Sequence, residues 1–297
     1  MKKAHGRSLS LGNFFHKKLP LLTTIFPVTF WLVLLVAIPL IYVFVLSFLT
    51  RMPNGSVSFT FTLANYAKIV NPEYLQVYGI SLFVAALTTL ICIILSYPFA
   101  WFMAQGTKKR KTLMLLMVII PFWTNSLIRL YGWKTILGNE GILNKTLMAL
   151  HLIKEPLQML FTTPAVILGM IYTLLPFMIL PIYASVEKLD KTLLEAANDL
   201  GAKTISSFIH ISLPLTAPGI FAGSIMVFIP TLGYFFVSDL MGGGNTMMVG
   251  NLIKNQFYTA QNWPLGAALS IVLIIITLIL VKIYTLIGGK MDDLGVA

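Results

Sequence analysis

Long, mostly apolar runs without charged residues recur along the chain, and shorter polar segments separate them. Six runs are long enough for a helix that crosses a bilayer, which needs about 20 mostly apolar residues. We expect their apolar centres at residues 21–48, 77–102, 113–128, 165–183, 219–237 and 265–286. The third run is the shortest and contains Pro121, which a span tolerates where neighbouring helices satisfy the freed carbonyl. The pattern predicts an all-α, multi-pass membrane protein with six transmembrane helices.

Composition supports this class of protein. Of the 297 residues, 57% are hydrophobic and 10% are charged, whereas charged residues make up about 25% of ordinary soluble domains. So few charges cannot cover the surface of a soluble fold of this length. A soluble enzyme, a nucleic-acid-binding domain and a secreted disulfide scaffold are therefore excluded. The single cysteine, Cys92, lies in an apolar run and is expected to be a small buried hydrophobe.

The distribution of basic residues predicts the orientation. The side that carries both termini holds twice as many of the 21 Lys and Arg residues as the other side does. Basic residues are retained on the cytoplasmic side, so both ends are expected in the cytoplasm. The expected organisation is a basic tail at 1–18, a first helix at 19–50, an external loop at 51–76, five further helices within 77–286 and a second tail at 287–297.

The cytoplasmic segment 185–218 is the longest polar stretch on its side. Apolar residues recur at helical spacing up to Gly201, which suits the left-handed position that ends a helix. A second short helix is expected around Phe208, before Pro214 and Pro218 mark the start of the fifth span. Two short helices that meet at a glycine form a compact docking surface.

Glu195 in this segment has two interpretations. With Thr192 it matches a capping box, in which the carboxylate bonds back to the backbone of the helix start. Alternatively, Glu195 and Asp199 lie four residues apart, where like charges destabilise a helix by about 0.2–0.5 kcal/mol. A basic groove on a partner would reverse that effect, so the pair also fits a docking surface.

Catalytic and coupling signatures are missing from the sequence. It has no zinc-protease, nucleophile-elbow or phosphate-loop motif, and no cofactor is expected. None of the apolar centres contains an acid that could couple transport to an ion. The chain is therefore expected to supply a pathway and to depend on a separate ATPase, without being an enzyme itself.

The motif in segment 185–218 resembles the EAA loop of ABC importer permeases. The matching pattern is Glu-Ala-Ala at 195–197, glycine at 201 and Ile-x-Leu-Pro at 211–214. The residues to which the resemblance assigns ATPase coupling are Glu195, Ala196, Ala197, Asp199, Gly201, Ile211, Leu213 and Pro214. It implies the type I importer permease fold over 77–286, in a bacterial cytoplasmic membrane. The implied partners are an ATPase dimer, a second permease subunit and an extracytoplasmic solute-binding protein.

Further motifs resemble one subfamily, the spermidine/putrescine permeases of the PotB type. They are Tyr-Pro-Phe-Ala-Trp at 97–101, Pro-Phe-Trp-Thr-Asn-Ser-Leu-Ile-Arg at 121–129, Glu-Lys-Leu-Asp-Lys at 187–191, Val-Ser-Asp-Leu-Met-Gly-Gly at 237–243, Gly-Asn-Leu-Ile-Lys at 250–254 and Trp-Pro-Leu-Gly-Ala at 263–267. Related permeases for other solutes share parts of these motifs. A permease for thiamine, iron or phosphate is therefore an alternative, and a membrane scaffold that transports nothing is a more distant one.

Local features fit a cationic substrate, although the outward loops carry no excess of acid. Aromatic residues cluster near the expected outer ends of spans, and Asp239 follows three of them. The candidate pathway residues are Trp123, Tyr131, Tyr234, Phe235 and Asp239. Aromatic faces and a carboxylate hold alkylammonium groups, through contacts of roughly 0.5–2 kcal/mol each. The alternatives are an interfacial aromatic belt and a hydrogen-bonding role for Asp239 at a helix end.

Overall fold

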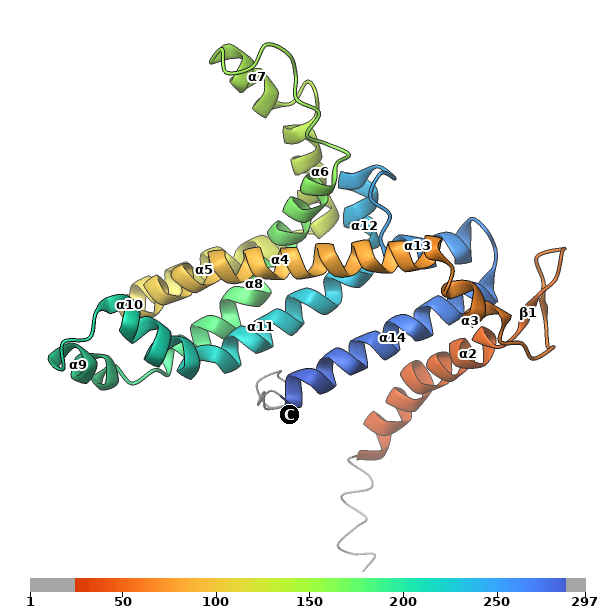
Figure 1. Ribbon diagram of the computed structural model, residues 1–297, viewed down its shortest axis with the longest axis horizontal. Helices are drawn as coiled ribbons and strands as arrows, with labels where there is room; N and C mark the ends of the chain where they lie inside the picture. Colours follow the sequence, from red (N-terminus) through yellow and green to blue (C-terminus); the bar gives the residue numbers. More distant parts are fainter. Residues whose placement is uncertain (1–24, 287–297) are drawn as a thin grey trace, which may run out of the picture.

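The computed structural model describes residues 25–286, and this part of the chain is mostly helical (Figure 1). The tails expected at 1–18 and 287–297 lie outside the described residues. In the labels used here, η marks a π-helical or 3₁₀ segment. The elements are η1 (Val33–Ala37), α2 (Ile38–Ser47), β1 (Thr50–Arg51), β2 (Val57–Ser58), α3 (Ala64–Ile69), α4 (Pro72–Ala104), α5 (Lys108–Ile119), η2 (Ile120–Trp123), α6 (Ser126–Leu137), α7 (Ile142–Ala149), α8 (Thr163–Glu187), α9 (Thr192–Asp199), α10 (Thr204–Ser207), η3 (Phe208–Ser212), α11 (Leu213–Gly233), α12 (Phe235–Val237), η4 (Ser238–Gly242), α13 (Val249–Tyr258) and α14 (Trp263–Leu286).

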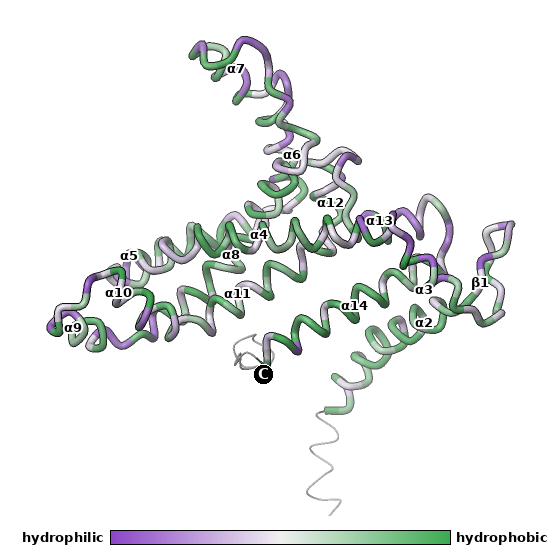
Figure 2. Tube along the Cα trace, in the orientation of Figure 1, coloured by the Kyte–Doolittle hydropathy of each residue, from purple (hydrophilic) through white to green (hydrophobic). Residues whose placement is uncertain are grey.

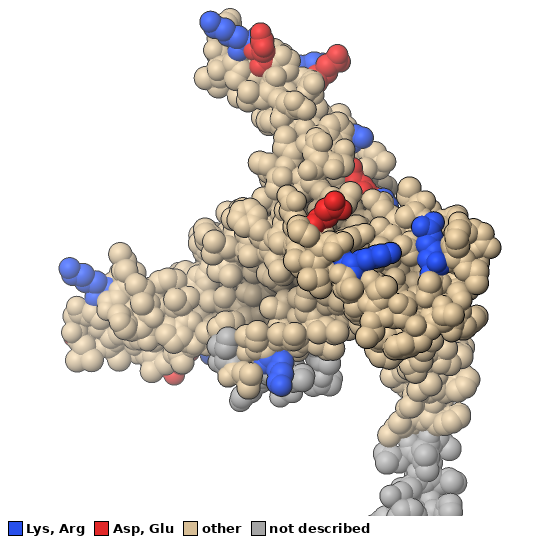
Figure 3. Space-filling view, turned by 45° about the vertical axis from the view of Figure 1, so that its right-hand side comes forward, with Lys and Arg blue, Asp and Glu red and all other residues tan. Residues whose placement is uncertain are grey.

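Five helices in the described part are long and apolar enough to cross a membrane. They are Ile25–Ser47, Pro72–Ala104, Thr163–Glu187, Thr204–Gly233 and Trp263–Tyr284. They coincide with five of the six expected spans. Figure 2 shows the apolar character of α2, α4, α8, α11 and α14 along most of their lengths. On the face seen in Figure 3, charged side chains are sparse and broad uncharged surface lies between them.

The third expected span is not one straight helix. The segments Lys108–Trp123 and Ser126–Ala149 are bent by 92° relative to each other. They form a sixth span only if the two bent segments together cross the membrane once. The expectation of one continuous helix through the apolar centre at 113–128 is therefore wrong. The break has a local cause. Pro121 falls in a 3₁₀ turn, Thr124 is extended, and Asn125 caps α6 by accepting from the Leu127 N–H at 2.8 Å.

Three helices, α4, α8 and α11, form the centre of the molecule and pack against one another. The side chains between them include Cys92, Met178, Ile182 and Val227, all buried. The expectation for Cys92 is therefore confirmed. Close approach of α8 and α11 depends on Gly219, where a Cβ would lie 2.5 Å from the Pro181 carbonyl oxygen. Gly223 allows the same close approach one turn further on, where a Cβ would lie 3.2 Å from the Met178 Cα.

The segment expected to contain a second short helix and then the fifth span is continuous. Helical structure runs from Thr204 to Gly233, through α10, η3 and α11. The second short helix is thus the amino-terminal end of the fifth span. That span also ends earlier than expected, because Tyr234 leaves the helical conformation and separates α11 from α12.

At the edge of the molecule, α2 lies beside α14 (Figure 1). The most apolar part of the helical segment Ile25–Ser47, to which α2 belongs, has no buried residue within this chain. In α2 the buried positions are confined to its end, at Leu46 and Ser47. Asn65 of α3 anchors that end by donating to the Ser47 and Leu49 carbonyls at 3.0 and 2.9 Å. Most of α2 therefore presents apolar side chains to whatever surrounds the chain.

Candidate coupling loop and substrate pathway

Helix α9 stands apart from the long helices, at the end of the molecule where α4 ends and α5 begins (Figure 1). None of its residues is buried. Its first turn is stabilised from outside the helix, because the Thr192 N–H donates to Asp190 Oδ1 at 3.0 Å. This hydrogen bond lowers the pKa of the Asp190 carboxyl. The capping box that was one of the two interpretations of Glu195 does not form, because the N-cap residue is Lys191 and no side chain caps the helix.

Helix α9 ends as the sequence predicts. Gly201 has φ +80°, in the left-handed region that glycine adopts without a steric penalty. The Gly201 N–H donates to the Asn198 carbonyl at 2.9 Å, and the Ala202 N–H donates to the Ala197 carbonyl at 3.0 Å. These two bonds are the Schellman motif of helix ends. The glycine of the motif therefore sets the angle at which the chain leaves α9.

The expected coupling residues divide into two groups in space. Glu195, Ala196 and Asp199 are exposed on α9, and Ala197 is half-buried. Ile211, Leu213 and Pro214 lie on η3 and at the start of α11. Leu200 is 89% exposed, so the apolar face expected of this helix is uncovered within the chain. An exposed surface with acids on one side and leucines on the other suits a protein partner.

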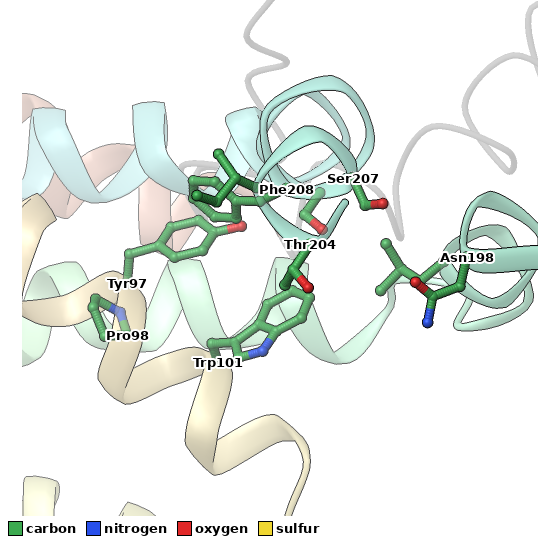
Figure 4. A pocket seen from close by; sticks show the side chains of 10 residues that line it. Tyr97, Pro98, Trp101, Asn198, Thr204, Ser207 and Phe208 are labelled. Atoms are coloured by element: carbon green, nitrogen blue, oxygen red, sulfur yellow. The ribbon is translucent and has the colours of Figure 1, made fainter. Parts of the chain in front are cut away.

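A cavity of about 510 Å³ separates α9 from the end of α4. Figure 4 shows its aromatic wall, formed by Tyr97, Trp101 and Phe208, with Asn198 of α9 on the opposite side. Tyr97 stacks with Trp101 at 6.4 Å between ring centroids and meets Phe208 edge-on at 5.2 Å. The Tyr97 hydroxyl also hydrogen-bonds the Thr216 hydroxyl at 2.9 Å. The motif at 97–101 thus joins α4 to both η3 and α11.

A second cavity, of about 380 Å³, lies on the other side of Trp101 and includes Glu195 in its wall. Beside it, Lys111 Nζ of α5 lies 2.9 Å from Glu187 Oε1 of α8. This ion pair ties the start of α5 to the end of α8. The end of α8 that leads into the loop carrying α9 is therefore held against α5.

The expected pathway aromatics lie in two places. Some lie at the end of the long helices opposite α9, and the others lie at the bend of the third span. Trp123 ends η2 and is 80% exposed, and Tyr131 on α6 is 54% exposed. Tyr234 and Phe235 lie where α11 breaks, and both contact the Phe236 ring at 5.0 and 6.3 Å. The structure thus separates the five candidates into a pair beside the bend and a group of three around α12 and η4.

Asp239 lies in η4 and already has partners within the chain. Its Oδ1 accepts from Asn251 Nδ2 at 2.6 Å, and its Oδ2 lies 2.6 Å from Lys254 Nζ. Both partners are on α13, which packs against α12. The hydrogen-bonding role that was the alternative for Asp239 is therefore present, and the carboxylate is also paired with an alkylammonium group of this chain.

Arg129 is a candidate pathway residue that the sequence pattern does not single out. Its guanidinium lies 5.1 Å from the Phe122 ring and 5.4 Å from the Tyr172 ring, at a cavity of about 290 Å³ between α4, α5 and α8. Its buried Nε has no hydrogen-bond partner among the described residues. The available signal was a charged residue at the end of the motif at 121–129, which begins with a proline inside the shortest expected span.

The chain is similar in sequence to known transport proteins. It is 48% identical over 269 residues to the spermidine/putrescine transport system permease protein PotB of Salmonella typhimurium, covering 89% of this chain and 94% of that protein. The PotB proteins of Escherichia coli and Haemophilus influenzae are 49% and 47% identical over 254 residues. These two alignments cover 86% of this chain and 92% and 89% of the relatives.

Solved structures share the fold at low sequence identity. A bacterial ABC transporter that imports the acidic polysaccharide alginate superposes with a TM-score of 0.75 at 17% identity, over 94% of this chain and 99% of that one. The same type of transporter, in complex with an alginate-bound periplasmic protein, also gives a TM-score of 0.75, at 16% identity. The sequence model described as "Binding-protein-dependent transport system inner membrane component" matches residues 85–293. The chain therefore belongs to the family of inner membrane permease components of binding-protein-dependent ABC importers.

Proposed function

We propose that this chain is one of two permease subunits of an ATP-driven importer for polyamines, with spermidine and putrescine as the substrates. The observation that carries the substrate class is the high identity to PotB proteins over nearly their full lengths. The alginate transporters share only the fold, so they support the architecture and not the solute. The remaining alternative within the family is a permease for another small solute.

Energy would come from a separate ATPase dimer that receives α9. The exposed acids Glu195 and Asp199 and the uncovered Leu200 supply charge and apolar surface for a cleft with basic residues. Movement of α9 would reach the long helices through the contacts of Tyr97 with Phe208 and Thr216. The cavity between α9 and α4 leaves room for such a movement.

The second permease subunit and the solute-binding protein would complete the importer. The uncovered apolar face of α2 is a surface for lipid and for the second subunit. With both termini in the cytoplasm, α9 would face the ATPase, while α12, η4 and α13 would face the binding protein. The pathway would run between the two permeases, past the aromatic residues around Asp239 and Arg129.

Uptake by cells tests the proposal. The chain, its partner permease, the ATPase and the binding protein are produced in bacteria that lack polyamine importers, and uptake of labelled putrescine and spermidine is measured. We expect uptake to require both this chain and the ATPase. We expect unlabelled polyamines to suppress it, and thiamine, iron and phosphate to leave it unchanged. Uptake suppressed by one of those other solutes instead would assign the permease to that solute.

A further inference from the structure

Helix α5 begins with four consecutive basic residues, Lys108 to Lys111. Only the last of them forms an ion pair within residues 25–286, because Lys111 Nζ lies 2.9 Å from Glu187 Oε1. The other three, Lys108, Lys109 and Arg110, are exposed. Positive charges at the start of a helix are unfavourable, since the helix dipole is also positive there. The first turn of α5 therefore carries three cations that the described part of the chain does not pair.

One of the three cations is held in place by contacts with the end of α4 and the turn that follows it. The guanidinium carbon of Arg110 lies 3.8 Å from the centre of the Phe102 ring. The stem of the same side chain passes Gly106, where a Cβ would lie 3.1 Å from the Arg110 Cδ. A guanidinium presents several N–H donors in a plane, in the geometry that phosphate oxygens accept. The cluster of exposed cations thus includes one positioned group that suits a phosphate.

Beyond its basic start, α5 has an inward and an outward face. Met114 and Val118 on the inward face pack against the buried core that α4 and α8 share. On the outward face Leu113 and Leu116 are 53% and 43% exposed, and Ile120, the first residue of η2, is 49% exposed. The outward face is therefore an apolar stripe that no other part of the described chain covers.

The basic cluster and the apolar stripe form one continuous surface. Residues 109, 113, 116 and 120 follow one another at spacings of four, three and four, so Lys109 lies at the start of the stripe. From Lys109 to Ile120 a helix rises by about 16 Å. This length matches one leaflet, because the hydrocarbon core of a bilayer is about 30 Å thick. The surface therefore has the charge and the length that a single phospholipid requires.

We propose that this surface binds an anionic phospholipid of the leaflet on the α9 side of the membrane. The phosphate lies between Lys109 and the Arg110 guanidinium, and one acyl chain follows Leu113, Leu116 and Ile120. A headgroup with a net negative charge is preferred, because the ammonium group of phosphatidylethanolamine would add another cation to three that lack a counter-ion. The site does not depend on which solute the importer transports.

Photo-crosslinking in the assembled importer tests the site without any substitution. The complex is placed in phosphatidylcholine nanodiscs that contain phosphatidylglycerol with a diazirine in its acyl chain, and labelled peptides are identified by mass spectrometry. We expect labelling of residues 113–120 that added phosphatidylglycerol suppresses and added phosphatidylethanolamine does not.

Three results of this experiment would overturn the proposal. Equal suppression by both lipids would mean that the stripe accepts any phospholipid. Suppression by soluble inorganic phosphate would reduce the site to one for the free ion. Labelling elsewhere on the chain but not in residues 113–120 would mean that another subunit covers the stripe.

Removal of two lysines gives an independent measurement. The variant K108Q/K109Q keeps the other two basic residues of the cluster, and labelling is followed as the share of diazirine lipid in the nanodisc is raised. The share that gives half-maximal labelling should rise by about five- to twenty-five-fold, since each basic residue near an anionic surface contributes about fivefold. The matched control K188Q/K203Q removes two exposed lysines at the same end of the molecule and should resemble the wild type. An unchanged value in K108Q/K109Q, or an equal rise in both variants, would contradict the site.

Discussion

Single residues decide the shape of the loop that carries α9. Gly201 has φ +80°, and a Cβ at this position would meet no atom within 4 Å. Space is therefore not the constraint, and the backbone conformation alone requires glycine. The sequence was sufficient for this prediction, because a glycine after a short amphipathic helix is a local signal.

Replacement of Gly201 by alanine should impair coupling without loss of the protein from the membrane. The left-handed conformation costs an L-residue about 1–2 kcal/mol, which is enough to change how α9 leaves the loop. Substrate-stimulated ATP hydrolysis by the purified complex is expected to fall several-fold. Gly79→Ala is the control, because Gly79 lies within α4 with open space around it. Equal stimulation in the two variants would remove the special role of Gly201.

Glu195→Ala separates docking from helix stability. The capping box is absent, and Glu195 lies four residues from Asp199, so its removal should leave α9 as stable or slightly more stable. We expect less ATPase to co-purify with the permease complex, while the amount of permease in the membrane is unchanged. Glu140→Ala removes an exposed acid elsewhere and is the control. Normal ATPase recovery with the Glu195 variant would show that this carboxylate does not face the ATPase.

Asp239→Asn tests the electrostatic part of the substrate site. The amide keeps the size of the side chain, loses the charge and leaves a buried amide at Asn251 that still has an oxygen to bond. Polyamine uptake at low substrate concentration should fall, since a fixed carboxylate offsets the desolvation of an entering cation. Membrane insertion and ATPase recovery are expected to be normal. A titration curve that coincides with the wild type would limit Asp239 to hydrogen bonding.

At the scale of helices, the long apolar runs predicted five elements correctly, because 20 or more uncharged apolar residues have few alternatives to a buried or membrane helix. The bend of the third span was missed, since Pro121 and Asn125 are compatible with either a kink or a full break. The end of α11 at Gly233 was missed for a similar reason. Tyr234 is apolar enough to continue the pattern, but its backbone is not helical. The packing of α13 against α11 and α12 beside this point is not contained in the sequence spacing.

Helix packing gives a prediction that is independent of function. At Gly219 a side chain would collide with the Pro181 carbonyl and with Ser185, both part of α8. Gly219→Val should therefore separate α8 from α11 and destabilise the complex by about 1–3 kcal/mol. Thermal unfolding in detergent should show a lower midpoint than in Gly132→Ala, whose glycine has open space around it. An unchanged midpoint would mean that the two helices are less closely packed than the structure indicates.

At the scale of the whole molecule, the contacts form a chain from one end to the other. Helix α9 lies at one end, the aromatic residues of α4 and η3 connect it to the central helices, and the Asp239 site lies beside α13 at the opposite end (Figure 1). The sequence indicated the two ends separately, through the motif in segment 185–218 and through the acid after three aromatics. It could not show that Lys254 and Asn251 hold that acid, because the partners are 15 and 12 residues away on another helix.

The most direct test of the account is transport by the reconstituted importer. The purified complex is placed in proteoliposomes with ATP inside and the binding protein with labelled putrescine outside, and accumulation is measured with wild-type chain and with Glu195→Ala. We predict accumulation against a gradient that requires internal ATP, the binding protein and Glu195. Accumulation that is equal without ATP, or equal in the Glu195 variant, would contradict ATP-driven import through this coupling loop.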